Sequence, residues 1–203
     1  ELKLRQPGDD LATAILNTEL EGKKTDELTF GTFVLMMVVA GNETTRTVTS
    51  NGMRCLIENP EQRQLLLDNP SLIPAAIDEL LRFEPAVHQF RRRATEDTEI
   101  RGVKVRKDDK VVLWYPSANR DEEVFDDPQR LNLRRKNASD QIAFGVGQHF
   151  CLGAALARLQ LRCIFEETLG RIPDMELAGP VRRLRSVFIN GVKEMSVSFT
   201  PAA

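Results

Sequence analysis

The chain has 203 residues, 41% of them hydrophobic and 29% charged, with a formal net charge of −2 at pH 7. This composition is typical of a globular protein with one substantial core. The near-neutral charge gives no reason to expect a nucleic-acid partner, and the longest apolar run, residues 33–40, is too short to span a bilayer.

The N-terminal part predicts one short and one very long helix. Asp9 or Asp10 is expected to cap an amphipathic helix through residues 11–16, which ends before Gly22. Thr25 is expected to cap the long helix, from about residue 26 to residue 58, where Asn59-Pro60 stops it. At ~1.5 Å per residue this helix is a rod of roughly 50 Å. Because residues 33–40 are apolar on every side, this stretch is expected to run through the middle of the fold.

The middle and end of the chain predict shorter elements. Pro60 and Pro74 each suit a first helical turn, and the second of these helices is expected at about 74–83. Short strands are then predicted at 90–94, 99–105 and 110–114, a winding polar segment at 117–140, and a hairpin at 187–192. The predicted fold class is mainly α with a small β region, and residues 1–203 are expected to form one domain fragment.

The three cysteines are an odd and scattered set, which favours a reducing compartment such as the cytoplasm over a disulfide framework. Cys55 and Cys163 lie within helical patterns and are expected to be inert core residues. The chain starts at Glu1, with neither an initiator Met nor a signal peptide before it, so we expect it to be a piece of a longer protein.

The third cysteine, Cys151, closes a glycine-punctuated loop at residues 144–153 and precedes a helix predicted at about 153–169. Unpaired N–H groups and the positive end of the helix favour its thiolate form. Glycines at 145, 147 and 153 allow the backbone to approach a flat ligand. These features suit a haem iron, whereas the alternative for an isolated cysteine is a small buried core residue.

Two further patterns carry chemistry. The segment Ala40-Gly41-Asn42-Glu43-Thr44-Thr45 places small and polar residues inside the long helix. Gly41 would let a flat ligand or O2 approach, and Thr44 is expected to distort a helix turn, unless the segment is simply a polar turn facing solvent. Glu79 and Arg82 share one helix face at i,i+3, a spacing that by itself also fits a surface ion pair.

Together these segments resemble cytochromes P450, and the resemblance covers the chain as their C-terminal half. The haem-loop pattern Phe-Gly-x-Gly-x-His-x-Cys-x-Gly matches at all six fixed positions: Phe144, Gly145, Gly147, His149, Cys151 and Gly153. Residues 40–45 resemble the distal helix of that family, and Glu79-Leu-Leu-Arg82 resembles its buried Glu-x-x-Arg pair.

The resemblance implies roles for individual residues. Cys151 would be the axial thiolate of haem b, with Phe144, Gly145, Gly153, Ala40 and Gly41 around the haem. Glu43 and Thr44 would manage protons during O2 activation, and Glu79 and Arg82 would form a structural set with Arg130. His149 and Arg92 would contact the propionates. Strand alternation points Arg92 away from Arg91 and Arg93, whereas for His149 a plain loop histidine is the alternative.

The implied function is a haem-thiolate monooxygenase that inserts one atom of O2 into a C–H bond of a hydrophobic small molecule such as a sterol, terpenoid or branched lipid. A ferredoxin with its reductase would donate electrons, steered by basic residues near the cysteine loop: Arg134, Arg135, Lys136, Arg158 and Arg162. His88 and Gln89 are the local candidates for lining the substrate pocket. The alternatives are a haem-binding sensor module and an incomplete fragment without activity of its own.

Overall fold

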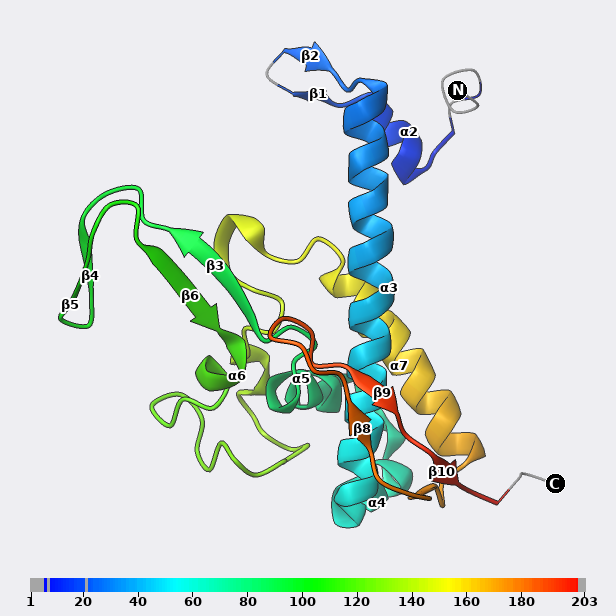
Figure 1. The fold of residues 1–203 in the computed structure, drawn as a ribbon. Coiled ribbons are helices and arrows are strands. Elements are labelled where there is room, and N and C mark those ends of the chain that lie inside the picture. The colour runs from blue at the N-terminus through cyan, green and yellow to red at the C-terminus, as the bar shows by residue number, and fades with distance from the viewer. Residues whose placement is uncertain (1–5, 7, 21, 201–203) are drawn as a thin grey trace. The chain divides into compact units, whose positions relative to one another are not determined.

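The computed structural model describes residue 6 and the ranges 8–20 and 22–200. The chain divides into two compact units, Glu1–Glu43 and Thr44–Ala203, and each is described by itself below. The long helix α3, Glu27–Glu58, contains the boundary between them (Figure 1). The expectation of one domain fragment over residues 1–203 stays a prediction.

In the first unit, both helices begin at an aspartate. Asp10 caps α2, Leu11–Leu16, where its Oδ1 accepts a hydrogen bond from the Thr13 N–H at 2.9 Å, as predicted. A small hairpin of β1, Glu19–Leu20, and β2, Lys23–Lys24, follows. At the start of α3 the prediction was wrong by one residue. Asp26 Oδ1 accepts from the Thr29 N–H at 2.7 Å, whereas the Thr25 hydroxyl donates to the Thr18 carbonyl.

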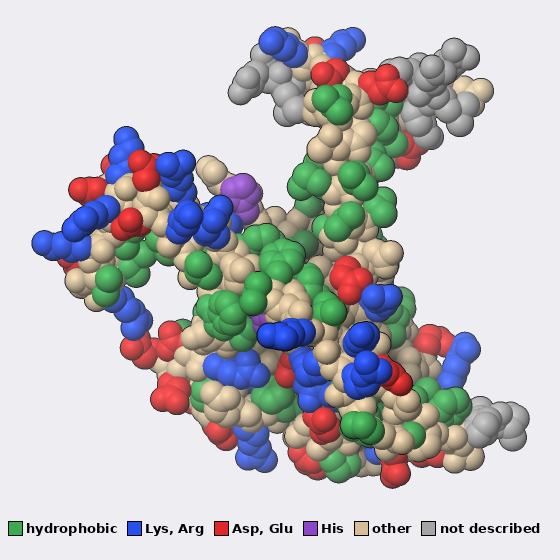
Figure 2. All heavy atoms as spheres, in the orientation of Figure 1, with side chains coloured by type: hydrophobic (Ala, Val, Ile, Leu, Met, Phe, Trp, Pro, Cys, Tyr) green, Lys and Arg blue, Asp and Glu red, His purple; other side chains and the backbone are tan. Residues whose placement is uncertain are grey.

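The apolar stretch of α3 at residues 33–40 is exposed, which corrects the expectation that it runs through the middle of the fold. Leu35, Met36, Val38 and Val39 each have 60% or more of their surface exposed. Figure 2 shows hydrophobic side chains open to solvent along this half of the helix. The reason is a lack of covering chain, since the rest of this unit's described residues form one short helix and a two-stranded hairpin.

The core of the second unit lies where the remaining part of α3 meets α4, Pro60–Asp68, α5, Ile73–Phe83, and α7, Ala154–Arg171. Helices α4 and α5 carry Pro60 and Pro74 in their first turns, as predicted. Gly52 of α3 permits a close approach, because a Cβ on it would lie 2.7 Å from Phe165 Cζ of α7.

Two cysteines of this unit have different surroundings. Cys55 is buried in the core as expected. Cys163 is exposed, because it lies on the outer face of α7 while Leu161 and Phe165 face the core, so its assignment as a core residue was wrong.

The strands of the second unit pair in small antiparallel ladders. The main pair joins β3, Gln89–Arg93, to β6, Lys110–Trp114, close to the predicted strands. The predicted strand at 99–105 is instead a hairpin of β4, Thr98–Ile100, and β5, Val103–Val105. Arg101 and Gly102 both adopt positive φ and turn the chain back. The short helices between elements are η1 Pro70–Leu72, α6 Tyr115–Ala118, η2 Ala138–Asp140 and η3 Gly147–His149.

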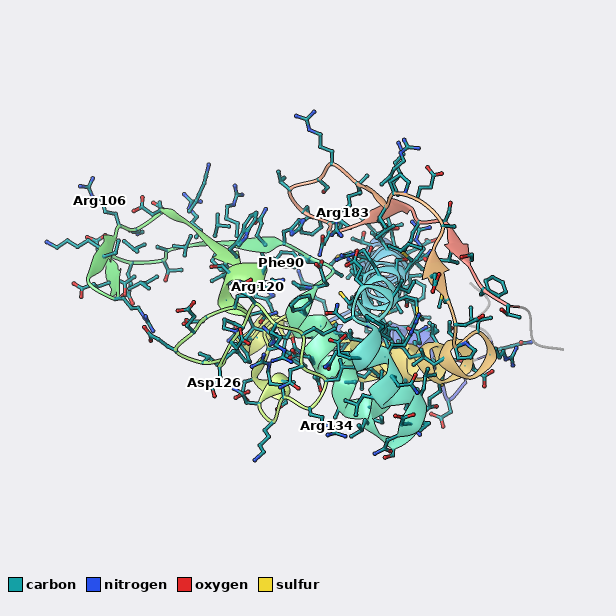
Figure 3. The ribbon with its side chains drawn as sticks, turned by 90° about the horizontal axis from the view of Figure 1, so that it is seen from below. Phe90, Arg106, Arg120, Asp126, Arg134 and Arg183 are labelled. Atoms are coloured by element: carbon teal, nitrogen blue, oxygen red, sulfur yellow. The ribbon has the colours of Figure 1, made fainter. Side chains whose placement is uncertain are left out.

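The C-terminal strands form two antiparallel ladders in place of the hairpin predicted at residues 187–192. Strand β8, Arg182–Arg183, pairs with β9, Val192–Glu194, and β7, Glu176–Leu177, pairs with β10, Val197–Ser198. Asn190 does not turn a tight hairpin, because it is buried and tied elsewhere. Its N–H donates to the Ala86 carbonyl at 2.8 Å, and its carbonyl accepts from Asn51 Nδ2 at 2.7 Å. Figure 3 shows Arg183, which belongs to β8, beside α3, where its Nη1 donates to Asn51 Oδ1 at 3.4 Å.

Residues 117–140 wind without strands, as predicted, between α6 and η2. Among the described helices, none combines the length and the apolar character that crossing a membrane requires.

Candidate functional site

The cysteine loop is closed by its own backbone. The Cys151 N–H donates to the Phe144 carbonyl at 2.9 Å, so the two ends of the loop lie together. Gly145 and Gly147 adopt left-handed φ values of 74° and 72°, which glycine tolerates best. Gly153 is the N-cap residue of α7, so Cys151 stands directly before that helix, as the sequence predicted.

The loop presents an open, apolar surface around a half-buried Cys151. Val146, Phe150 and Leu152 are all exposed, and Leu152 has 78% of its surface accessible. A Cβ at Gly147 would meet nothing within 4 Å, whereas a Cβ at Gly153 would touch the Cys151 sulfur at 4.0 Å. A flat apolar group laid on this loop would therefore meet one sulfur atom and no protruding side chain at either glycine.

Tyr115 connects the loop with strand β3, a link that the sequence analysis missed. A Cβ on Gly145 would lie 3.4 Å from the Tyr115 hydroxyl oxygen, so a side chain there would crowd the tyrosine. Burial raises the pKa of Tyr115, and the nearby positive charge of Arg92 opposes that shift. Arg92 is half-buried while Arg91 and Arg93 are exposed, in agreement with the predicted alternation. His149, the other predicted propionate contact, is exposed in η3.

Glu79 and Arg82 form a fully buried ion pair on α5, with 0% of either side chain exposed. Arg82 donates to both carboxylate oxygens, from Nε to Oε2 at 2.7 Å and from Nη2 to Oε1 at 2.8 Å. Its Nη1 donates to the backbone carbonyls of Asn119 and Pro128. The pair thus fastens the winding segment to α5, and the alternative of a surface ion pair is excluded.

The third member of this set is Arg135, and the prediction of Arg130 was wrong. Arg135 Nε donates to Glu79 Oε2 at 3.0 Å, with 6% of the Arg135 side chain exposed. The Arg130 side chain is exposed, and only its backbone carbonyl takes part, accepting from Arg82 and Arg135. Arg135 is held there because its guanidinium also donates to the carbonyls of Asp126 and Asp127.

The basic residues near the loop are mostly paired, which weakens the predicted positive surface. Arg135 is buried against Glu79, Arg158 pairs with Asp78, and Arg162 pairs with Glu166. Of the five residues in the predicted set, Arg134 and Lys136 stay exposed without an ion pair among the described contacts.

The residues predicted on the distal helix lie on consecutive turns of α3. Ala40 and Gly41 are exposed, and Glu43 and Thr44 are half-buried. Helix α3 continues through this segment, whereas Thr44 was expected to distort a turn. A hydroxyl can bond within the helix without breaking it, as Thr49 does by donating to the Thr45 carbonyl at 2.9 Å. Residues 40–43 belong to the first unit and the cysteine loop to the second.

Gln89 begins β3 and His88 directly precedes it, and both side chains are half-buried. The His88 ring stacks on Trp114 with centroids 5.9 Å apart, and the backbone N–H of His88 donates to the Phe188 carbonyl at 2.8 Å. Burial lowers the pKa of His88, and Arg183 lowers it further.

Comparison with known proteins decides the family. The cytochrome P450 family model matches residues 66–172, more than half of the chain, including Glu79, Arg82 and the loop that ends in Cys151. The chain belongs to the cytochrome P450 family. Its helix-rich structure with a small β region is that of part of the P450 fold.

Relatives of this P450 include named monooxygenases. It is 39% identical to the steroid C26-monooxygenase of Rhodococcus jostii, over 97% of this chain and 41% of the relative. It is 41% identical to the linalool 8-monooxygenase of Pseudomonas putida, over 99% of this chain and 49% of the relative. The chain therefore spans about half the length of the curated relatives it matches.

Solved P450 structures superpose on nearly the whole chain. CYP109E1 of Bacillus megaterium, in complex with testosterone, matches at a TM-score of 0.90 and 35% identity, over 97% of this chain and 55% of that one. Mycobacterium marinum cytochrome P450 CYP268A2, in complex with pseudoionone, matches at a TM-score of 0.91 and 39% identity, over 98% of this chain and 48% of that one.

Proposed function

We propose that this chain is the haem-ligating half of a P450 monooxygenase that inserts one atom of O2 into a C–H bond of a hydrophobic small molecule. The observation that carries the proposal is the Cys151 loop, where a half-buried sulfur stands at the centre of exposed apolar side chains and left-handed glycines. A thiolate ligand is the one that P450 haem requires.

The residues around Cys151 fit haem b. The backbone at Gly147 is open, since a Cβ there would meet nothing within 4 Å, and it leaves room for a macrocycle, while the apolar side chains of Val146, Phe150 and Leu152 suit its ring. When bound, thiolate-ligated haem supplies the activation of O2 that no amino-acid side chain can provide. We assign the two propionates to Arg92 and His149.

The chain's own groups have separate tasks in this proposal. The Phe144 carbonyl, which accepts from the Cys151 N–H at 2.9 Å, holds the ligand residue in place. We assign to Ala40 and Gly41, which are small and exposed, the task of letting the haem and O2 approach the backbone of α3. Glu43 and Thr44, half-buried on the next turn, would hold and deliver protons. Glu79, Arg82 and Arg135 keep the winding segment on α5.

The relatives support a terpenoid or steroid-like substrate, because those that are named act on steroids and linalool and the solved structures contain testosterone and pseudoionone. We propose His88 and Gln89 as pocket residues. The electron donor would be a ferredoxin with its reductase, meeting the exposed Arg134 and Lys136. The three unpaired cysteines suit the reducing cytoplasm, where we place the protein.

Two alternatives make different predictions. A haem-binding sensor would need no proton relay, so the presence of both Glu43 and Thr44 speaks against it. The chain alone could instead be an inactive half, a reading that the exposed apolar face of α3 favours. Adding haem to the isolated chain and recording absorbance tests this second alternative, and product formation with a ferredoxin system tests the first.

The proposal is tested by Cys151→Ser in a full-length P450 that contains this chain. The substitution should abolish the red-shifted Soret band of the ferrous–CO form, because a serine hydroxyl is a much poorer electron donor to iron than a thiolate. Cys163→Ser, an exposed cysteine on the helix that follows, is the matched control and should keep the band. If Cys151→Ser kept the band, the proposed ligand would be wrong.

A further inference from the structure

We infer that Arg158 is a positioning residue for Cys151 and that it acts through the ring of Phe144. The inference rests on the proposed role of Cys151 as the haem ligand. It gives Arg158 a task inside the protein, whereas the sequence alone had suggested a surface charge for an electron donor.

The backbone of Phe144 forms a hydrogen bond with Cys151, and its ring packs against Phe150 and Arg158. Its carbonyl accepts the Cys151 N–H at 2.9 Å. Its ring meets the Phe150 ring edge-on, with centroids 6.4 Å apart, and the Arg158 guanidinium carbon lies 4.7 Å from its centroid. The ring and the carbonyl belong to one residue, so contacts that fix the ring also limit the movement of the carbonyl that holds Cys151.

Arg158 is fixed over that ring by a second contact. Its Nε and Nη2 both donate to Asp78 Oδ1, at 3.1 and 2.8 Å. The Arg158 side chain is 35% exposed and that of Asp78 only 17%, so the pair is partly shielded from water. The planar guanidinium can stack on the ring and bind the carboxylate at once, which a lysine ammonium cannot do in the same way.

The same carboxylate also holds the start of the loop. Buried Gln141 donates from Nε2 to Asp78 Oδ1 at 3.1 Å, and its Oε1 accepts from the Ala143 N–H at 2.6 Å. Asp78 precedes Glu79, so two adjacent acids on α5 organise different segments: Glu79 binds the winding segment, and Asp78 binds Gln141 and Arg158, on either side of the cysteine loop.

The arrangement places a fixed cation beside the ligand loop. A positive charge near the haem iron stabilises the reduced state, which carries one more electron, so loss of the charge makes the reduction potential more negative. Loss of the stacking contact also frees the Phe144 ring, which should let the thiolate-bound CO form decay faster. These two effects distinguish a positioning role from one in stability alone.

The test uses Arg158→Gln in the full-length holoenzyme, with Arg162→Gln as the matched control. Arg162 lies one turn further along α7 and pairs with Glu166, with 53% of its side chain exposed. Arg158→Gln should lower the reduction potential of the iron and shorten the lifetime of the red-shifted ferrous–CO band several-fold, while Arg162→Gln changes neither. Arg158→Lys should keep a reduction potential close to that of the wild type but a shortened lifetime of the ferrous–CO band, because lysine keeps the charge and loses the planar contact.

A double-mutant cycle with Phe144→Leu tests whether Arg158 acts through the ring. The two substitutions should be strongly non-additive in band lifetime, since either one removes the same contact. Additive effects, or an Arg158→Gln protein equal to Arg162→Gln in both readouts, would overturn the inference. If Arg158→Gln does not retain haem, Arg158→Lys carries the lifetime measurement and should still shorten the lifetime of the band. A wild-type protein lacking the band would instead refute the proposed ligand, so the two failures are distinguishable.

Discussion

The Arg82 guanidinium donates Nε and Nη2 hydrogen bonds to the two carboxylate oxygens of Glu79, and neither side chain has any exposed surface. Burying two charges costs several kcal/mol each, which their attraction repays only when the remaining donors and acceptors are satisfied. Here they are satisfied by Arg135, by the Asn132 N–H and by backbone carbonyls of the winding segment. The pair therefore acts as the point at which an otherwise irregular segment is attached to the helical core.

Glu79→Ala should destabilise the protein by roughly 3–5 kcal/mol and reduce haem retention, because it leaves Arg82 and Arg135 as unpaired buried charges. Thermal unfolding and haem content of the full-length protein measure this. Glu123→Ala is the control, since Glu123 forms an exposed ion pair with Arg101 and its removal should cost under about 1 kcal/mol. Equal melting temperatures for the two variants would contradict the buried pair.

Arg135→Gln should cost about 1.5–3 kcal/mol, the range for a buried hydrogen bond to a charged group, and Arg130→Gln less than about 0.5 kcal/mol. The difference follows from the geometry, because the Arg135 side chain binds Glu79 while that of Arg130 is exposed. Chemical or thermal unfolding of both variants checks the order. A larger loss of stability for Arg130→Gln than for Arg135→Gln would support Arg130, as predicted from the sequence, as the partner of Glu79 and Arg82.

Gly52→Ala should destabilise the protein although alanine is the better helix former by about 1 kcal/mol. The new Cβ would lie 2.7 Å from Phe165 Cζ, and overpacking of this kind typically costs about 1–3 kcal/mol. The control is Gly41→Ala, where a Cβ meets nothing within 4 Å. The free energy of unfolding of the haem-free protein should therefore be unchanged or slightly higher in this variant. Combining Gly52→Ala with Phe165→Leu should recover part of the loss, and no recovery would argue against this contact.

Thr44→Ala should leave the haem spectra nearly unchanged but divert electrons from product to hydrogen peroxide, because Thr44 is assigned to proton delivery. The ratio of product to reduced cofactor consumed, with peroxide measured in parallel, tests this. Thr49→Ala is the matched control, since its hydroxyl donates to the Thr45 carbonyl within the same helix. Unchanged coupling in Thr44→Ala would make Thr44 a packing residue only.

Stability should fall at high pH in part through Cys55. Burial raises the pKa of the Cys55 thiol from 9.0 to about 12, so the folded state holds this proton more tightly than the unfolded state does. The contribution is therefore complete below about pH 9 and is lost as the pH rises toward 12. The free energy of unfolding, measured at increasing pH, should decline less steeply for Cys55→Ala than for the wild type. A thiol reagent at neutral pH should modify exposed Cys163 long before Cys55, and equal rates would contradict the burial.

The sequence by itself determined the elements whose signals are local. Asp10 caps α2 through a side chain that reaches only three residues along the chain, and Pro60 and Pro74 open helices because their rings suit a first turn. Strand β6 follows from its β-branched and aromatic residues, Val111, Val112 and Trp114, next to the turn residues at 107–109. The Cys151 loop was identified for the same reason, since its spacing of glycines, histidine and cysteine is contained within ten residues.

Contacts between distant segments were decided only by the tertiary structure. Arg134, Arg135 and Lys136 are equivalent as a basic run, and Arg135 alone turns inward because Glu79, 56 residues earlier, accepts its hydrogen bond. The three arginines of β3 could be sorted by strand alternation, but the neighbouring Tyr115 could not be foreseen beside Gly145. Likewise, an apolar helix surface predicts burial without saying which chain covers it, and α3 is exposed at residues 33–39 because the described part of its own unit is too small to do so. Local patterns specify elements through nearby backbone and side-chain chemistry, whereas the choice among equivalent side chains depends on partners that only folding brings together.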